Sequence, residues 1–206
     1  KFLTNALNKE PISKYEEIDL LGYIASCAMK TENYYGVIEC VDNVLDKFDN
    51  PQSIESVVIK SRKLKALNEI GNFGEVVNLA ENEIIPVIES TLANKSSKYK
   101  LISEEEVFET WIYTLFALVK ALTRQGNDRA FKVINELFKI LEANEIHDKQ
   151  FFCNLQLELA LANTIKGNVN MSNKILNDIF EIYQNSDVIN SLVVSRLNLI
   201  SLLNNC

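Results

Sequence analysis

Few residues of this chain have the type and spacing that catalysis requires. The single histidine, His147, lies between Glu145 and Asp148 in a polar stretch that separates two helical runs, where a solvated loop residue is the ordinary outcome. The sequence contains no HExxH motif, no P-loop, no GxGxxG motif and no Ser, His and acid order. We therefore expect a protein that is not an enzyme.

Metal or redox chemistry has an equally weak basis. Glu104, Glu105 and Glu106 are adjacent, so on a helix their carboxylates point apart, and acids in a first turn complement the helix dipole. The four cysteines show no CxxC spacing and no pairing with histidine; they are Cys27, Cys40, Cys153 and Cys206. Cys27 and Cys40 fall on the two arms of one expected helical hairpin, so a disulfide stays open beside the favoured reading of reduced thiols. We expect no metal and no cofactor.

The composition limits the class of partner. The chain has 206 residues, of which 47% are hydrophobic and 24% charged, a balance typical of a folded domain or one repeat array. Because 28 acidic residues face 21 basic ones, the net charge is −7, and we do not expect direct binding of nucleic acid. No segment approaches the roughly 18 apolar residues that a membrane span needs, and no signal-peptide pattern opens the chain, so we expect a cytoplasmic protein that does not enter membranes. The missing initiator Met leaves open that this is a piece of a longer protein.

Helical periodicity dominates the sequence. Four hairpins of two helices are expected at about 15–48, 52–90, 103–144 and 148–184, followed by a helix at 187–203 that has no partner. Each hairpin has a short turn of residues that tolerate a left-handed backbone or are small: Glu32-Asn33-Tyr34, Gly71-Asn72-Phe73, Gly126-Asn127-Asp128 and Gly167-Asn168-Val169. No segment makes a convincing strand.

Local signals refine these boundaries. Asn50 followed by Pro51 predicts the start of a helix, and Pro86 predicts an end or a kink at Ile85. The Lys- and Ser-rich stretch 91–102 predicts a loop between hairpins. Ser103 and Glu106 form the pattern of a capping box at the start of the next helix.

Recurring helical hairpins are the mark of an α-solenoid, whose stacked pairs expose a surface for recognition. We expect an all-α solenoid of antiparallel helix pairs with about nine to ten helices, forming a single domain over 1–206. The terminal helix carries an apolar face that either caps the array or joins two copies into a homodimer; its residues are Leu192, Val193, Leu197 and Ile200.

With the hairpins aligned, the chain resembles the tetratricopeptide repeat family in a divergent form. Small residues and turn residues carry the resemblance: Ala25, Ala28 and Tyr34 in the first hairpin, Ala66, Gly71, Asn72 and Phe73 in the second, Gly126 and Ala130 in the third, and Ala160, Gly167 and Ser172 in the fourth. Glu32 replaces a glycine, Val76 and Glu83 replace alanines, and the turns lie 39, 55 and 41 residues apart, longer than the family's repeat of about 34. Another α-solenoid or a helical bundle remains the alternative.

The resemblance implies a right-handed array and a concave groove lined by the first helix of each pair. In that register the side chains expected to bind a partner are Lys65, Asn68, Tyr113, Phe116, Lys120, Arg124 and Leu157. The three cations would favour a protein or peptide segment bearing acids, while the aromatic residues and Leu157 would anchor it.

The expected function is that of a scaffold or adaptor, a non-catalytic subunit of a larger assembly that binds partner protein. Two alternatives stay open. One is the peptide-sensing domain of a bacterial regulator of the quorum-sensing type, which the family resemblance allows. The other is a helical-repeat subunit of a ribonucleoprotein such as the signal recognition particle, with protein-mediated contact to the RNA.

Overall fold

The computed structural model describes residues 14–46, 48, 50–93, 102–183 and 191–204. Every regular element in these ranges is helical, which confirms the all-α fold class. If α5, η1 and α6 are counted as one continuous helix, the described residues form nine helices. Within those ranges no helix combines the length and the apolar character needed to cross a membrane.

The chain divides into two compact units, residues 1–117 and 118–206, and each is described by itself. The boundary falls inside one helix, α7 (Glu104–Arg124). The expectation of a single domain over 1–206 stays a prediction.

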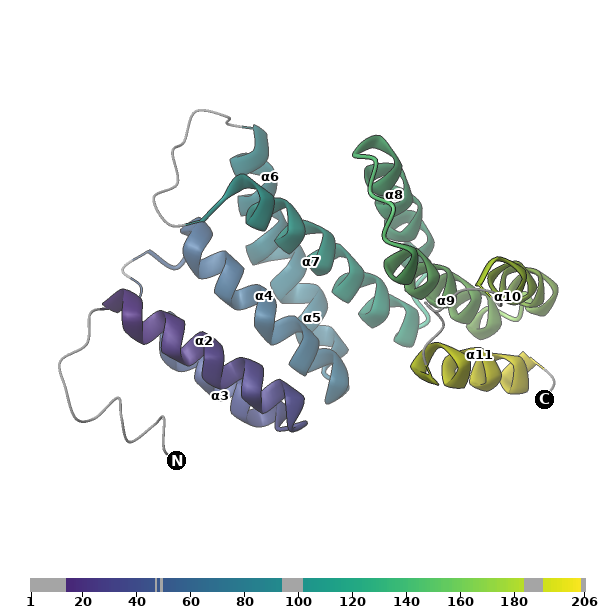
Figure 1. The fold of residues 1–206 in the computed structure, drawn as a ribbon, viewed down its shortest axis with the longest axis horizontal. Coiled ribbons are helices and arrows are strands. Elements are labelled where there is room, and N and C mark those ends of the chain that lie inside the picture. Colours follow the sequence, from purple (N-terminus) through teal and green to yellow (C-terminus); the bar gives the residue numbers. More distant parts are fainter. Residues whose placement is uncertain (1–13, 47, 49, 94–101, 184–190, 205–206) are drawn as a thin grey trace. The chain divides into compact units, whose positions relative to one another are not determined.

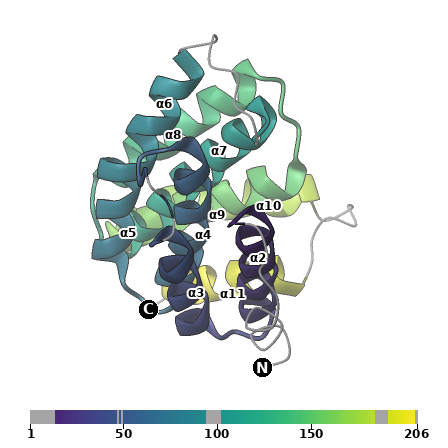
Figure 2. The ribbon, with the colours of Figure 1, turned by 90° about the vertical axis from the view of Figure 1, so that its left-hand side faces the viewer.

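The first unit begins with three helices that pack side by side, α2 (Lys14–Lys30), α3 (Tyr34–Leu45) and α4 (Ile54–Glu69) (Figures 1 and 2). Aliphatic side chains at helical spacing form their shared core: Ala25, Val37, Cys40, Val41, Val44, Ile59 and Ala66. In this hairpin Ala25 of α2 and the apolar side chains Val37, Val41 and Val44 of α3 are buried, whereas Cys27 of α2 is exposed.

The helix that contains Pro86 does not end at Ile85. It runs as α5 (Phe73–Leu79), a π-helical turn η1 (Ala80–Ile84) and α6 (Ile85–Ala93), and Ile85 itself has helical dihedral angles. The Ile85 N–H bonds the Ala80 carbonyl, five residues back rather than four. Because Pro86 has no N–H and its ring would clash with the carbonyl four residues earlier, a locally widened turn accommodates it without stopping the helix. The helix also covers 91–93, and residues 94–101 of the expected loop lie outside the described residues.

Helix α4 starts later than Asn50 and Pro51 predict. Its N-cap is Ser53, whose hydroxyl accepts a hydrogen bond from the Ser56 N–H at 3.2 Å. Asn50 instead caps its own turn by accepting a bond from the Gln52 N–H at 3.0 Å. At α7 one bond of the predicted capping box is present: the Ser103 hydroxyl accepts from the Glu106 N–H at 3.1 Å.

The second unit contains the end of α7 and α8 (Arg129–Ala143), α9 (Lys149–Ile165), α10 (Val169–Tyr183) and α11 (Ser191–Asn204). Helix α9 contacts α8, α10 and α11. Its core with α10 and α11 consists of Cys153, Leu157, Ala160, Leu176, Ile179 and Ile200, with Leu197 packed beside them. Leu197 and Ile200 thus turn inward, as the capping alternative requires, while the side chains of Leu192 and Val193 lie outside the described residues.

Five helix ends share one turn geometry. A residue with positive φ follows each helix, and the next N–H bonds the carbonyl five residues back, as in Asn72 to Leu67 at 2.9 Å. This double-bonded C-terminus is the Schellman motif. The residues with positive φ are Glu32, Gly71, Gly126, Glu145 and Gly167. The first, second, third and fifth of these are the turns that the sequence predicts. Glu145 is one that it missed: it is not a glycine, and Ile146 follows it where the other four turns have Asn.

The described cysteines are thiols. Cys27 and Cys40 are not joined by a disulfide, and Cys153 forms none either, whereas Cys206 lies outside the described residues. Burial raises the pKa of the Cys40 thiol despite the opposing influence of a backbone hydrogen bond at Ala25 and the charge of Arg62.

Candidate functional site

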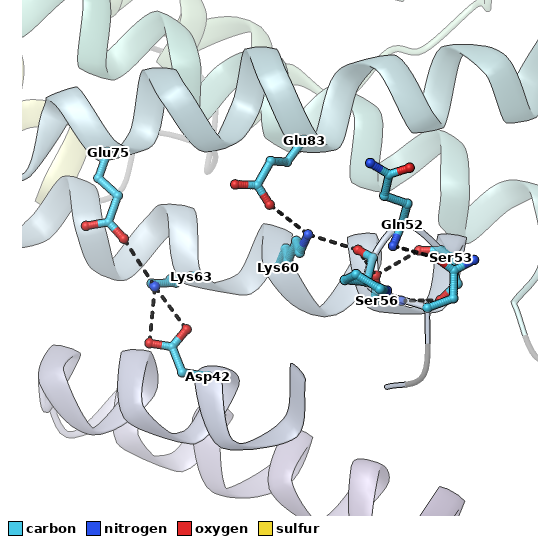
Figure 3. A network of polar contacts seen from close by, with 10 residues as sticks. Asp42, Gln52, Ser53, Ser56, Lys60, Lys63, Glu75 and Glu83 are labelled. Carbon is cyan, nitrogen blue, oxygen red and sulfur yellow. Dashed lines mark hydrogen bonds and ion pairs between the residues drawn. The ribbon is translucent and has the colours of Figure 1, made fainter. Parts of the chain in front are cut away.

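Two lysines of α4, Lys60 and Lys63, form ion pairs with acids of neighbouring helices in the first unit (Figure 3). Lys63 Nζ lies 2.9 Å from Asp42 Oδ1 on α3 and 3.1 Å from Glu75 Oε1 on α5. Burial disfavours the charged lysine, but the hydrogen bonds and charges of Asp42 and Glu75 outweigh it, so the pKa of Lys63 is raised. Lys63 is therefore a structural bridge between two helices.

Lys60 makes the second bridge, one helical turn earlier. Its side chain is only 10% exposed, and its ammonium donates to the Pro51 carbonyl at 2.9 Å and to Glu83 Oε2 at 2.7 Å. The Ser56 hydroxyl also donates to the Pro51 carbonyl, at 2.6 Å. These bonds fix the segment before α4 against the π-helical turn and hold Glu83 in place (Figure 3).

A solvent-open groove of about 460 Å³ lies beside this second bridge. We call it the α4–α6 groove; it is lined by Gln52, Ile54, Asn82, Glu83, Pro86, Val87, Ser90 and Thr91. Ile54, Pro86 and Val87 supply apolar surface, and the other lining residues supply two amides, two hydroxyls and one carboxylate. Figure 3 shows the Gln52 side chain extending toward the helix that carries Glu83. The groove therefore combines apolar side chains with polar groups able to bond a peptide main chain.

The helix that forms one wall of this groove carries charge of a single sign. Residues 73–93 contain Glu75, Glu81, Glu83 and Glu89 and no lysine, arginine or histidine. Glu75 and Glu83 face the two bridging lysines, while Glu89 is exposed next to Ser90 of the groove lining. The wall is thus acidic where it meets solvent.

In the first unit the expected partner-binding residues have different environments. Lys65 and Tyr113 are exposed, and Phe116 is half-buried. Asn68 is buried, and its amide donates to the Ala117 carbonyl of α7 at 3.0 Å. Asn68 is therefore committed to packing α4 against α7 and does not offer its amide to a peptide.

In the second unit the expected residues are still less available. Arg124 forms a two-point ion pair with Glu158: Nη1 bonds Oε2, and Nη2 lies 3.3 Å from Oε1. The Glu158 side chain is 0% exposed, so the guanidinium serves a buried carboxylate. Leu157 is also 0% exposed and packs in the core of α9, α10 and α11, where no partner reaches it. Lys120 is half-buried.

Two other hollows in the described residues offer fewer groups to a ligand. One, of about 640 Å³, surrounds the turn between α9 and α10 and is lined by Asn163, Gly167, Asn168, Val169, Asn170, Met171 and Lys174. Its buried amide, Asn163, already donates to the Leu159 carbonyl and accepts from Asn168. The other lies under Arg62 beside Gly22 and has about 10 Å³, room for no more than one water.

The described residues contain no group of three or more His, Cys, Asp or Glu side chains that could hold a metal ion. His147 is exposed between α8 and α9, in the loop position that the sequence predicts. Its exposure agrees with the solvated loop residue expected from its neighbours.

Sequence reasoning missed the α4–α6 groove altogether. Two signals could have pointed to it: a proline inside a sustained helical pattern, and a helix of 21 residues (73–93) whose only charges are acidic. A π-turn caused by such a proline is a frequent feature of functional sites.

No protein-family model, no curated protein and no solved structure matches this chain. Any statement about function therefore starts from the chain's own residues and their contacts.

Proposed function

We propose that this protein is a helical-repeat scaffold that binds a segment of a partner protein. The observation that supports it most is the repeated turn. The same Schellman geometry joins α2 to α3, α4 to α5, α7 to α8 and α9 to α10, each time with Asn directly after the residue of positive φ. One local device repeated at every helix pair is typical of repeat architectures of the tetratricopeptide type.

In this proposal the pairs are antiparallel and stack into a right-handed solenoid, with α11 capping the last pair. Leu197 and Ile200 support the capping role because they are packed against α9 and α10. Stacked pairs expose an extended surface, and proteins of this kind act by holding partners.

The structure changes which residues the binding test should alter. Replacing Arg124 with an acid would place a second carboxylate beside the buried Glu158 and unfold the second unit. Loss of a partner by that variant would therefore report unfolding and would not identify a binding residue. Lys65 is exposed, so its charge can be reversed more safely, whereas Lys120 is half-buried and its variant is used only if its circular dichroism matches that of the wild type.

The experiment is an affinity pull-down from native lysate with the full chain, comparing wild type with Lys65→Glu and Lys120→Glu. Lys132→Glu on α8 is the matched control, since Lys132 is exposed and outside the expected binding set. All variants must keep the helical circular dichroism of the wild type. The proposal predicts a partner that wild type and the control retain and that Lys65→Glu or Lys120→Glu loses. If no protein is retained above background by any of the four, the scaffold function is wrong.

A further inference from the structure

We infer that the α4–α6 groove binds an extended, basic segment of a partner protein, with a lysine or arginine side chain of that segment at Glu83. This inference rests on the proposed scaffold function and names the chemistry of one partner. It differs from the acid-bearing partner that the cations Lys65 and Lys120, each in its own unit, would favour.

The first reason is the chemistry of the groove lining. Its one ionisable side chain is the Glu83 carboxylate, and the side-chain oxygens of Gln52, Asn82 and Thr91 add neutral acceptors. Arginine and lysine carry several donors and no acceptor, which makes them the natural complement of carbonyl and carboxylate oxygens.

The second reason is the charge balance at Glu83. Lys60 occupies Oε2 of Glu83, and that ammonium is also bound to the Pro51 carbonyl. The bridge orients the carboxylate, whose side chain remains 43% exposed. A second cation from the solvent side can therefore reach the carboxylate, and the exposed Glu89 adds attraction over the distance of a Debye length.

The third reason concerns the shape of the ligand. The groove volume of about 460 Å³ falls in the range of specific binding sites, and its lining mixes apolar and polar side chains. The amides of Gln52 and Asn82 and the hydroxyls of Ser90 and Thr91 can bond peptide N–H and C=O groups, which only an extended segment leaves available. A helical ligand has its main chain already satisfied and would not use them.

The test is a selection from a random 12-residue peptide library on the immobilised full chain, followed by fluorescence anisotropy with the selected peptides. We expect peptides enriched in lysine or arginine alternating with apolar residues, whose binding weakens as salt is added. Ser90 is the position to change, because it is exposed, lines the groove and takes no part in the bridge between Lys60, Pro51 and Glu83.

Three variants separate charge from bulk. Both Ser90→Lys and Ser90→Glu remove the Ser90 hydroxyl and add similar bulk, so the effect of charge is the ratio between them: Ser90→Lys should bind the selected peptide at least tenfold more weakly than Ser90→Glu. Asn177→Lys, an exposed site on α10, should leave it unchanged. Lysine and glutamate both suit a helix, so the fold is retained.

Three results would overturn the inference: selected peptides without an excess of basic residues, equal losses with Ser90→Lys and Ser90→Glu, or no enriched peptide. Acid-rich peptides that lose binding only with Lys65→Glu would also overturn it, yet they would uphold the scaffold function. The pull-down, which leaves Ser90 intact, judges that function independently.

Discussion

The buried Glu158 carboxylate determines the role of Arg124. A carboxylate that is 0% exposed needs a partner charge, and Arg124 supplies it through both guanidinium nitrogens. The pairing joins residues 34 positions apart on α7 and α9. The repeat register assigns Arg124 to a groove face, but the register does not show that Arg124 already forms an ion pair with an acid from another helix.

Removing this arginine should be costly. Arg124→Met leaves the Glu158 carboxylate buried without its cation, and we expect the free energy of unfolding to fall by about 3–5 kcal/mol. The measurement is urea denaturation followed by circular dichroism. Arg124→Met combined with Glu158→Leu should recover at least half of the loss, because both charges are gone. A double variant no more stable than the single one would contradict this account of the pair.

Lys63 predicts a dependence on alkaline pH. Its pKa is raised in the folded protein, so its contribution is fully present below the unfolded lysine pKa of about 10.4 and is lost as the pH rises through the higher folded value. The stability difference between wild type and Lys63→Met, measured by urea denaturation, should therefore shrink at alkaline pH. Near pH 7 we expect Lys63→Met to be about 1–2 kcal/mol less stable, since Asp42 and Glu75 are partly hydrated. A difference that stays constant up to pH 12 would rule out the bridge as its source.

At the scale of elements, local chemistry made most boundaries predictable. Gly71, Gly126 and Gly167 all have the positive φ that their position after a helix requires, and the apolar stripes around them are buried. Where prediction failed, a competing local interaction won. Ser53 caps α4 in place of Asn50, and a π-turn lets the helix pass Pro86. Neither outcome follows from residue type alone.

The turns offer a test in which no side-chain contact interferes. A Cβ at Gly71 would meet no atom within 4 Å, so Gly71→Ala should cost only the strain of positive φ, about 1 kcal/mol. Glu32 already bears that strain, so Glu32→Gly relieves it. Glycine also raises the entropy of the unfolded chain, which opposes the gain, and we expect a net stabilisation of about 0.5 kcal/mol. Thermal unfolding should show a lower midpoint temperature for Gly71→Ala and a higher one for Glu32→Gly. If Glu32→Gly destabilises by as much as Gly71→Ala does, the shared-turn interpretation fails.

Helix α11 depends on polar as well as apolar contacts. Asn204 donates to Ser172 and Asn173 at 3.0 and 2.7 Å and accepts from Thr164 at 2.7 Å. Ser172 is fully buried, so Asn204→Ala should leave its hydroxyl with fewer partners and loosen the attachment of α11. We expect about tenfold faster hydrogen exchange in α11, with other helices unchanged.

Leu202→Ala is the control for that measurement. Leu202 is 65% exposed on the opposite side of the helix from Ile200, so its truncation should not change the exchange rate. Equal acceleration by both variants would show that the Asn204 contacts do not set the exchange, since alanine favours the helix at both positions.

At the scale of the whole molecule, helical periodicity predicts that a segment is a helix, but it does not predict which face of that helix remains accessible to a partner. Helix α9 contacts α8, α10 and α11, so Leu157, assigned to a groove from its register, is covered. The α4–α6 groove arises where the segment before α4 meets a helix some thirty residues later, and a sequence read locally does not reveal such a meeting. The all-α class was thus predictable, whereas the identity of the available surface required the contacts.

If the helix pairs stack into an extended array, small-angle X-ray scattering of the full chain at low protein concentration should give a radius of gyration above about 20 Å, as expected for a solenoid. A compact domain of 206 residues has a radius of gyration of about 17 Å. A monomer at about 17 Å would rule out the array and, with it, the scaffold function built on its surface.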